Sequence, residues 1–307
     1  MEPIVRISGL SHRYSTSWAI RDINIEIPRS GIVGLLGSNG AGKSTTMNIL
    51  CGVLRPTAGS VTINGIDLSK EPERAKQEIG FLPQTPPLYM DLTVDEYLLH
   101  TAILRSVEKP KLQSALAEVK ERCGLSHINK RLIKNLSGGY KQRVGIAQAI
   151  IHHPKLVVFD EPTNGLDPNQ ILEVRALIKD IAAERAVILS THILTEVQYL
   201  CRDIVMIESG RIVFSDTMEA FDNYIAPHSM LVVMENAPPA SALLAIEGIV
   251  RIEMLTEKQL RIYFNGDRRV SEAVVLESAK QGWRLSELNM EKNSLDETFA
   301  QLSRISH

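Results

Sequence analysis

Residues 37–44 read Gly-Ser-Asn-Gly-Ala-Gly-Lys-Ser, which satisfies the pattern G-x-x-x-x-G-K-[ST] of a phosphate-binding loop. The loop follows an apolar run at residues 32–36 and precedes a helix that we expect from Lys43 to Leu54. Strand, glycine loop and helix therefore occur in the order that lets backbone N–H groups and a helix N-terminus face an anion. We expect Lys43 to reach the β- and γ-phosphates of a nucleotide and Ser44 to bind Mg²⁺.

Two further apolar runs end in polar residues that suit phosphate chemistry. Residues 156–159 lead to Asp160 and Glu161, and residues 187–190 lead to Thr191 and His192. A strand that is buried on both faces in a parallel sheet presents its first polar residues at the C-terminal edge, where ligands bind. There Asp160 can hold Mg²⁺, and Glu161 can act as general base for an attacking water. His192 can contact the γ-phosphate or that water and can hold Glu161 in register.

A third element, Leu-Ser-Gly-Gly at residues 136–139, stands before a stretch that reads Tyr-Lys-Gln-Arg. Taken with the phosphate loop, the acidic pair and His192, this pattern resembles the ATP-binding-cassette family, and specifically the nucleotide-binding subunit of an ABC transporter. The resemblance covers roughly residues 4–217. It implies a P-loop α/β fold with a mixed sheet, a helical subdomain at about residues 85–150, and an ATPase that uses ATP and Mg²⁺.

The resemblance also implies roles for individual residues. Lys43, Glu161 and His192 would be catalytic, together with Gln84 at the hinge of the helical subdomain. Ser44, Gln84 and Asp160 would hold Mg²⁺. The residues that the resemblance places at the nucleotide are Tyr14 at the adenine and Gly37, Ser38, Asn39, Gly40, Ala41, Gly42, Lys43, Ser44, Thr45, Gln84, Ser137, Gly138 and Gly139 at the phosphates.

One residue departs from the family pattern, because Tyr140 stands where the fifth signature residue is usually Gln. The phosphate contacts in this family come chiefly from the signature Ser and the glycine amides, so Ser137, Gly138 and Gly139 preserve that chemistry. We expect Tyr140 to change packing at the helix start. Residues 165–168, Gly-Leu-Asp-Pro, include the predicted D-loop. Together with Tyr140 and a C-terminal extension, they resemble the drug-export, gliding-motility and ABC-2 type branch.

The length of 307 residues predicts two domains. We expect the cassette to occupy residues 1–225 and an accessory domain to occupy residues 226–307, with a joint at residues 226–228. The expected accessory strands are residues 230–233, 249–252, 260–264 and 284–288, and the expected helices are residues 240–246, 269–280 and 294–302. This βαββαβα order predicts a small α+β domain of ferredoxin-like type.

Composition narrows the partners and the compartment. A net charge of −2 gives no indication of nucleic acid as a general partner. No apolar run approaches the roughly 18 residues of a membrane span, and the N-terminus lacks a basic-then-apolar signal. The widely spaced Cys51, Cys123 and Cys201 indicate core positions in a reducing compartment. We therefore expect a cytoplasmic protein that reaches the inner face of the cell membrane through integral-membrane permease subunits.

The resemblance implies a mechanism that one chain cannot complete. In this family two chains pair head to tail, so a homodimer would bury two ATP molecules between the phosphate loop of one copy and the signature of the other. ATP-driven closure and opening would then power an exporter. The alternative is a non-transport ABC ATPase that acts as a regulatory or mechanical module. Such ATPases usually carry two cassettes or a long coiled coil before the signature, and the interval between Lys43 and Leu136 is too short for that coiled coil.

Overall fold

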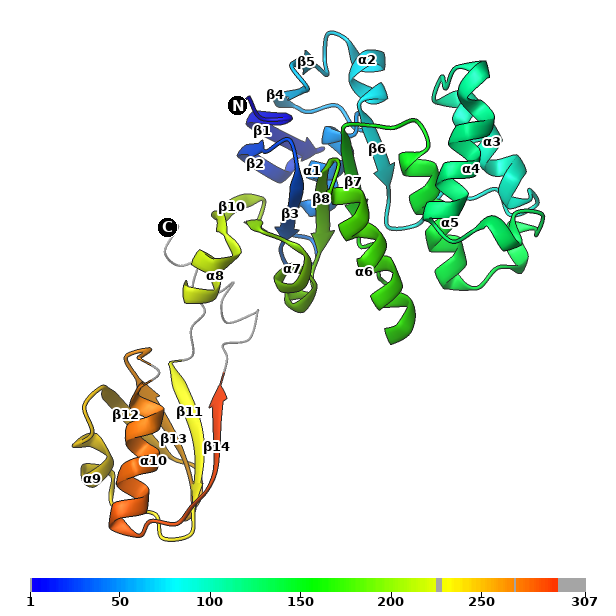
Figure 1. Cartoon of the computed structure of the whole chain (residues 1–307). Coiled ribbons are helices and arrows are strands. Elements are labelled where there is room, and N and C mark those ends of the chain that lie inside the picture. Colours follow the sequence, from blue (N-terminus) through cyan, green and yellow to red (C-terminus); the bar gives the residue numbers. More distant parts are fainter. Residues whose placement is uncertain (1, 225–227, 268, 292–307) are drawn as a thin grey trace. The chain divides into compact units, whose positions relative to one another are not determined.

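The computed structural model describes residues 2–224, 228–267 and 269–291 (Figure 1). The chain divides into two compact units, and the first of them ends at Met218. The sequence predicts a boundary between residues 225 and 226. Residues 225–227 are outside the described part of the chain, so this boundary stays a prediction. Among the helices that the structure describes, none is long and apolar enough to cross a membrane.

The central sheet of the first unit is mostly parallel and positions the predicted site. Its strand order is β10-β9-β3-β8-β7-β6, and only β10 runs antiparallel to its neighbour. The strands are β3 (Gly31–Leu36), β6 (Ile79–Leu82), β7 (Leu156–Asp160), β8 (Ala186–Thr191), β9 (Asp203–Glu208) and β10 (Arg211–Thr217). Every residue of β7 and β8 is buried, as expected for strands covered on both faces. The three predicted apolar strands are therefore confirmed.

A second, antiparallel sheet completes the core, with α1 (Lys43–Leu50) in contact with both sheets. Its strand order is β2-β1-β4-β5, and its strands are β1 (Val5–Tyr14), β2 (Ser17–Ile27), β4 (Ala58–Ile63) and β5 (Ile66–Asp67). Helix α1 is shorter than predicted. It ends at Leu50 because Gly52 adopts φ +66° and the N–H of Val53 turns back to donate to the carbonyl of Asn48 at 2.8 Å.

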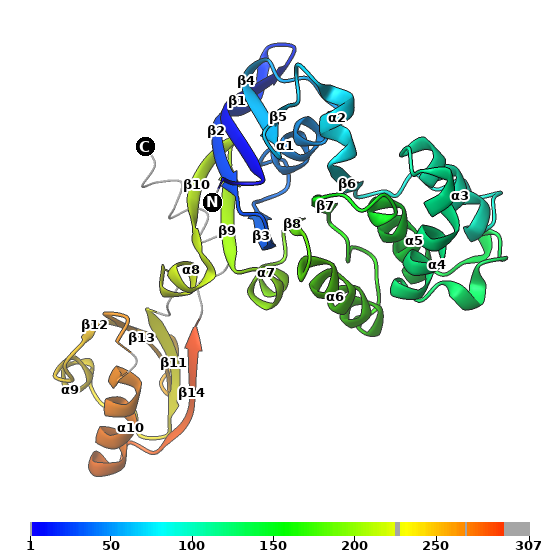
Figure 2. The ribbon, with the colours of Figure 1, turned by 45° about the horizontal axis from the view of Figure 1, so that its top comes forward.

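Three helices form a group beside the central sheet (Figure 2). They are α3 (Val94–Leu104), α4 (Leu112–Arg122) and α5 (Gly138–Ile150). Thr93 begins α3 through a capping box, in which its hydroxyl accepts the N–H of Glu96 while the Glu96 carboxylate accepts the N–H of Thr93. The remaining helices of this unit are α2 (Pro72–Gln77), α6 (Pro168–Ala182) and α7 (Leu194–Leu200).

The second unit has the predicted ferredoxin-like topology. All neighbouring strands run antiparallel in the order β12-β13-β11-β14, and Met230, Val232, Ile262, Phe264 and Val274 are among its buried core residues. The elements are α8 (Met218–Tyr224), β11 (Ser229–Met234), α9 (Ala240–Leu244), β12 (Ile249–Met254), β13 (Gln259–Phe264), α10 (Arg269–Gln281) and β14 (Leu285–Glu291). The helix expected at residues 294–302 lies outside the described residues.

Several side chains in the first unit are buried in neutral form. Cys51, Cys123 and Cys201 are free and buried, and burial raises the pKa of the Cys123 and Cys201 thiols to about 12. Burial, helped by the charge of Arg105, lowers the pKa of His152 to about 4. Nε2 of His152 lies 3.0 Å from the carbonyl oxygen of Ile79. Because a carbonyl oxygen can only accept a hydrogen bond, Nε2 carries the proton of the ring.

His152 therefore predicts a dependence of stability on pH. The unfolded chain takes up this proton below about pH 6.5 and the folded chain only below about pH 4, so the free energy of unfolding falls as pH decreases through that window. The loss is on the order of 3 kcal/mol by the linkage relation. Chemical denaturation of wild type and His152→Gln at several pH values checks it. His100→Gln, a change at an exposed histidine, is the control. If the free energy of unfolding depends on pH with the same slope in wild type and His152→Gln, the prediction is wrong.

Candidate functional site

The phosphate loop joins the C-terminal end of β3 to the N-terminus of α1. Gly42 is the N-cap residue of α1 and has φ +112°, a left-handed conformation that glycine adopts without strain. Gly37 faces the backbone of β9 so closely that a Cβ there would overlap the carbonyl oxygen of Ile207. Sterics therefore require glycine at both positions, and the first-turn N–H groups of α1 open toward the loop.

Lys43 is buried, and its ammonium group lies over the loop. Its Nζ donates to the carbonyl oxygens of Gly37 at 2.8 Å and Ser38 at 3.0 Å. Burial lowers the pKa of Lys43, while the nearby carboxylates of Glu161 and Asp160 act in the opposite direction. The positive charge is thus placed beside the site, where an anionic phosphate would interact with it strongly.

The phosphate loop and the start of α1 line a cavity of about 250 Å³. Eight predicted site residues line it, together with Ala19, which the sequence analysis did not identify; the eight are Asn39, Gly40, Gly42, Lys43, Ser44, Thr45, Gln84 and Glu161. Residues from the phosphate loop, from the segment after β6 and from the end of β7 therefore converge on one space, as the strand-edge argument predicted.

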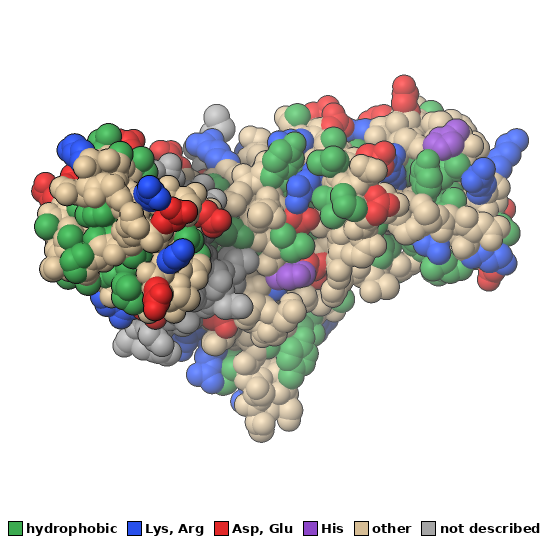
Figure 3. All heavy atoms as spheres, turned by 90° about the horizontal axis from the view of Figure 1, so that it is seen from below, with side chains coloured by type: hydrophobic (Ala, Val, Ile, Leu, Met, Phe, Trp, Pro, Cys, Tyr) green, Lys and Arg blue, Asp and Glu red, His purple; other side chains and the backbone are tan. Residues whose placement is uncertain are grey.

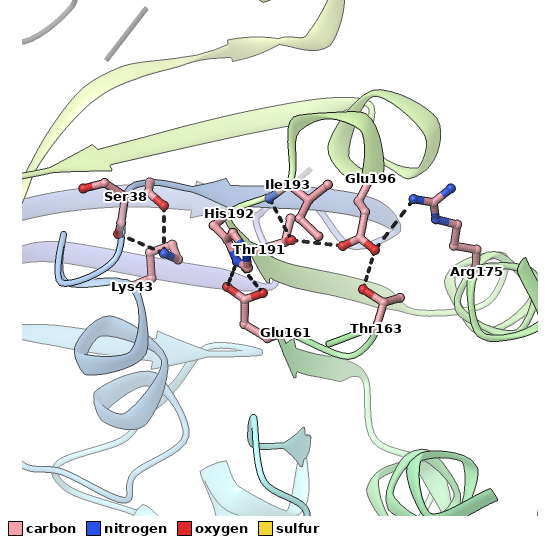
Figure 4. A network of polar contacts seen from close by, with 10 residues as sticks. Ser38, Lys43, Glu161, Thr163, Arg175, Thr191, His192, Ile193 and Glu196 are labelled. Carbon is pink, nitrogen blue, oxygen red and sulfur yellow. Dashed lines mark hydrogen bonds and ion pairs between the residues drawn. The ribbon is translucent and has the colours of Figure 1, made fainter. Parts of the chain in front are cut away.

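Glu161 and His192 meet at this edge of the sheet. Nδ1 of His192 lies 2.9 Å from both carboxylate oxygens of Glu161 (Figure 4). Glu161 follows β7 directly and has φ +51°, and its N–H donates to the Ser190 carbonyl at 2.9 Å. A left-handed backbone at a residue other than glycine costs roughly 1–3 kcal/mol and is found most often at functional sites. Here it accompanies a carboxylate that is buried yet faces the cavity.

The residues expected to hold Mg²⁺ fit such an ion. Asp160 ends β7 and is buried, and its Oδ1 has no hydrogen-bond partner among the described residues. A carboxylate oxygen in that state needs a cation or a water bound to one. Ser44 and Gln84 supply a hydroxyl and an amide oxygen at the cavity wall. The described part of the chain has no cluster of three His, Cys, Asp or Glu side chains that could hold a metal by itself.

Seven of the residues predicted to contact the nucleotide are not among those that line the cavity: Gly37, Ser38 and Ala41 of the phosphate loop, together with Tyr14, Ser137, Gly138 and Gly139. Tyr14 ends β1 with 52% of its surface exposed, and its ring packs edge-on against His12 at 4.7 Å between centroids. Ser137, Gly138 and Gly139 lie at the N-terminus of α5, where Ser137 is the N-cap residue. The structure therefore does not bring the signature into the cavity of its own chain.

Two other sequence expectations concern helix starts. Asp167 of the predicted D-loop is the N-cap of α6, and its carboxylate accepts the N–H groups of Asn169 and Gln170 at 3.0 Å. Tyr140 lies in the first turn of α5, where its hydroxyl is 3.2 Å from Nε2 of His127. The expected effect of Tyr140 on packing at this helix start thus takes the form of a contact with His127.

The sequence analysis missed a group of polar residues behind the site. Glu196 of α7 is buried, and its carboxylate accepts hydrogen bonds from the hydroxyls of Thr163 and Thr191 (Figure 4). Glu208 ends β9 and accepts the hydroxyl of Ser38 at 2.8 Å. The sequence signal for Glu196 is weak, since it is one acidic residue in a short helix whose neighbour Val197 is apolar.

Comparison with known proteins identifies the family. Residues 20–164 match the family model described as ABC transporter. The bacitracin transport ATP-binding protein BcrA of Bacillus licheniformis is 38% identical over 214 residues, which cover 69% of each chain. The lantibiotic transport ATP-binding protein SrtF of Streptococcus pyogenes is 35% identical over 221 residues, 72% of this chain and 93% of SrtF.

One further relative and one solved structure extend the comparison. The linearmycin resistance ATP-binding protein LnrL of Bacillus subtilis is 28% identical over 307 residues, 98% of each chain, and so includes the second unit. A solved ATP-binding subunit of an ABC transporter superposes with a TM-score of 0.66 at 30% identity, covering 71% of this chain and 92% of that one. Together with the phosphate loop, the contact between Glu161 and His192 and the buried Asp160 at the end of β7, these likenesses show that the chain belongs to the ABC transporter family.

Proposed function

We propose that this chain is the ATP-hydrolysing subunit of an ABC-2 type exporter. The observation that carries the hydrolytic role is the Glu161 carboxylate, which faces the cavity and is held at 2.9 Å by Nδ1 of His192. Membership of the family makes the chain an ATPase. The transport activities named for BcrA and SrtF, and the resistance named for LnrL, support export as the process that hydrolysis powers.

The chain's own residues supply each step at the γ-phosphate. Lys43 neutralises phosphate charge, and Glu161 accepts a proton from the attacking water. His192 keeps the carboxylate of Glu161 aimed at that water and can contact the γ-phosphate. Mg²⁺, held by Ser44, Gln84 and Asp160, would neutralise the charge that develops between the β- and γ-phosphate oxygens.

We propose further that two copies of the chain close head to tail around ATP. The residues Ser137, Gly138 and Gly139 are outside their own cavity, and the start of α5 offers backbone N–H groups for an anion. In the dimer these groups would complete the partner's site, and Tyr14 would stack on the adenine. Closure and opening would move the three-helix group through Gln84, and integral-membrane permease subunits would hold the dimer at the inner face of the cell membrane.

Charge on the surface is compatible with protein partners of this kind. Figure 3 shows acidic and basic side chains mixed over the face that it draws, in keeping with the net charge of −2. Mixed charge lacks the broad positive field that draws proteins to nucleic acid.

Replacing Glu161 tests its role as the base. We expect Glu161→Gln to bind Mg-ATP and to lower turnover by about 10²- to 10⁴-fold, because the amide cannot take the proton. The dimer should then persist, as size-exclusion chromatography with Mg-ATP would show. Glu184→Gln changes an exposed carboxylate just after the C-terminal end of α6 and should leave turnover unchanged. A monomeric Glu161→Gln that hydrolyses ATP at the wild-type rate would remove Glu161 from the mechanism.

The contact through Nδ1 predicts which replacement of His192 retains activity. The side-chain amide nitrogen of Asn can occupy the place of Nδ1, whereas that of Gln corresponds to the more distant Nε2. We therefore expect His192→Asn to hydrolyse ATP faster than His192→Gln and His192→Ala, with nucleotide affinity similar in all three. Steady-state ATPase assays and nucleotide titrations measure both quantities. Equal rates for the Asn and Ala variants would contradict a role for the Nδ1 contact.

Mixing two inactive variants tests the composite site. Lys43→Ala and Ser137→Arg chains together form heterodimers with one intact site and one doubly damaged site. Activity should return to at most roughly a quarter of the wild-type level, because half of randomly paired dimers carry one intact site of two. Lys43→Ala mixed with the Lys43→Ala, Ser137→Arg double variant forms no intact site and serves as the control. Equal activity in the two mixtures would mean that the head-to-tail arrangement is wrong.

A further inference from the structure

The carboxylate of Glu196 is almost fully enclosed, with 1% of its side chain exposed. A buried charge is unfavourable unless hydrogen bonds and an opposite charge compensate it. Here the Thr191 hydroxyl donates to Oε2 at 3.0 Å, the Thr163 hydroxyl donates to Oε1, and Nη2 of Arg175 lies 3.7 Å from Oε1. Figure 4 shows these three side chains pointing toward the carboxylate from different segments of the chain.

Each of these partners is close to a residue of the proposed mechanism. Thr191 ends β8 and directly precedes His192, and its hydroxyl also accepts the N–H of Ile193 at 3.1 Å. The Thr191 hydroxyl therefore joins the residue before His192 to the residue after it, and the hydrogen bond to Glu196 holds this hydroxyl in place. Thr163 comes two residues after Glu161. One carboxylate thus connects the two loops that bring Glu161 and His192 together.

Arg175 extends this connection to α6, the helix that begins at the predicted D-loop. Its guanidinium lies 5.4 Å from the centre of the Tyr199 ring, and Nζ of Lys179 lies 3.7 Å from the same ring. Tyr199 is on α7, as is Glu196. Cation–π contacts of this kind add to the ion pair, so α7 is attached to α6 by both Glu196 and Tyr199.

We propose that Glu196 is a positioning residue that keeps His192 against Glu161. Glu196 is not among the residues that line the cavity, and its carboxylate accepts from Thr163 and Thr191, so it acts by fixing the segments that carry Glu161 and His192. Because catalytic groups that are misplaced by about 1 Å can lose roughly 10²-fold in rate, loosening this anchor affects the chemical step. The inference rests on the proposed roles of Glu161 and His192.

The main test combines Glu196→Gln with His192→Ala. Gln keeps the size of the side chain but removes the charge that faces Arg175. We expect Glu196→Gln to lower kcat by about 10- to 100-fold and to leave KM for ATP unchanged, since the phosphate loop is not altered. In the His192→Ala background the same change should have little further effect, because residues that act as one unit are not additive. Glu184→Gln is the matched control and should show wild-type kinetics.

The outcomes separate this inference from the proposed function. Two outcomes would overturn the positioning role while leaving His192 in the mechanism. One is a loss of kcat in the double variant that equals the product of the losses in the two single variants, and the other is a wild-type kcat for Glu196→Gln. A wild-type rate for His192→Ala would remove His192 from the mechanism and the positioning role with it. If Glu196→Gln does not fold, Thr163→Val and Thr163→Ser decide the question. The Val variant should lose kcat and the Ser variant should retain it, and equal kcat values for the two would overturn the proposal.

Discussion

The burial of β7 and β8 on both faces is the constraint from which the rest of the site follows. Strands with no exposed face can carry polar side chains only where they end, and these two strands lie side by side in register. Asp160 and Glu161 at the end of one and His192 just beyond the other must therefore meet at the same edge. The phosphate loop reaches that edge as well, because β3 pairs with β8 in parallel.

A second consequence is that the site depends on charges that are kept away from water. Lys43, Asp160, Glu161 and Glu196 are all buried, and a buried charge is unfavourable unless hydrogen bonds or an opposite charge compensate it. Lys43 has the loop carbonyls, Glu161 has His192, and Glu196 has two hydroxyls and Arg175. Asp160 has an oxygen with no hydrogen-bond partner among the described residues, which fits the proposed role of this carboxylate in holding Mg²⁺.

In the proposed dimer, the nucleotide contacts would be divided between two surfaces, and the cassette would therefore work in pairs. The cavity is lined by Lys43, Ser44, Gln84 and Glu161 among others, whereas Ser137, Gly138 and Gly139 at the start of α5 are not among its lining residues. An ATPase assembled across two chains is active only when they meet, so hydrolysis can be coupled to their approach and separation. The Glu196 anchor ties α7 to α6, the helix whose N-cap is Asp167.

The sequence by itself determined the parts of the site that follow from local rules. The phosphate loop is a contiguous pattern whose glycines meet steric demands that the structure displays at Gly37 and Gly42. The strands β3, β7 and β8 could be predicted because each is a short apolar run, and the ferredoxin-like order of the second unit could be predicted from alternating patterns. The end of α1 was predicted wrongly, because the turn at Gly52 that ends this helix early had not been identified.

Only the tertiary structure decided which distant side chains touch. The φ of Glu161, the Nδ1 contact of His192 and the convergence of Thr163, Thr191 and Arg175 on Glu196 depend on how strands and helices far apart in the chain pack together, and a buried acidic residue in a short helix has no local pattern that reveals its partners.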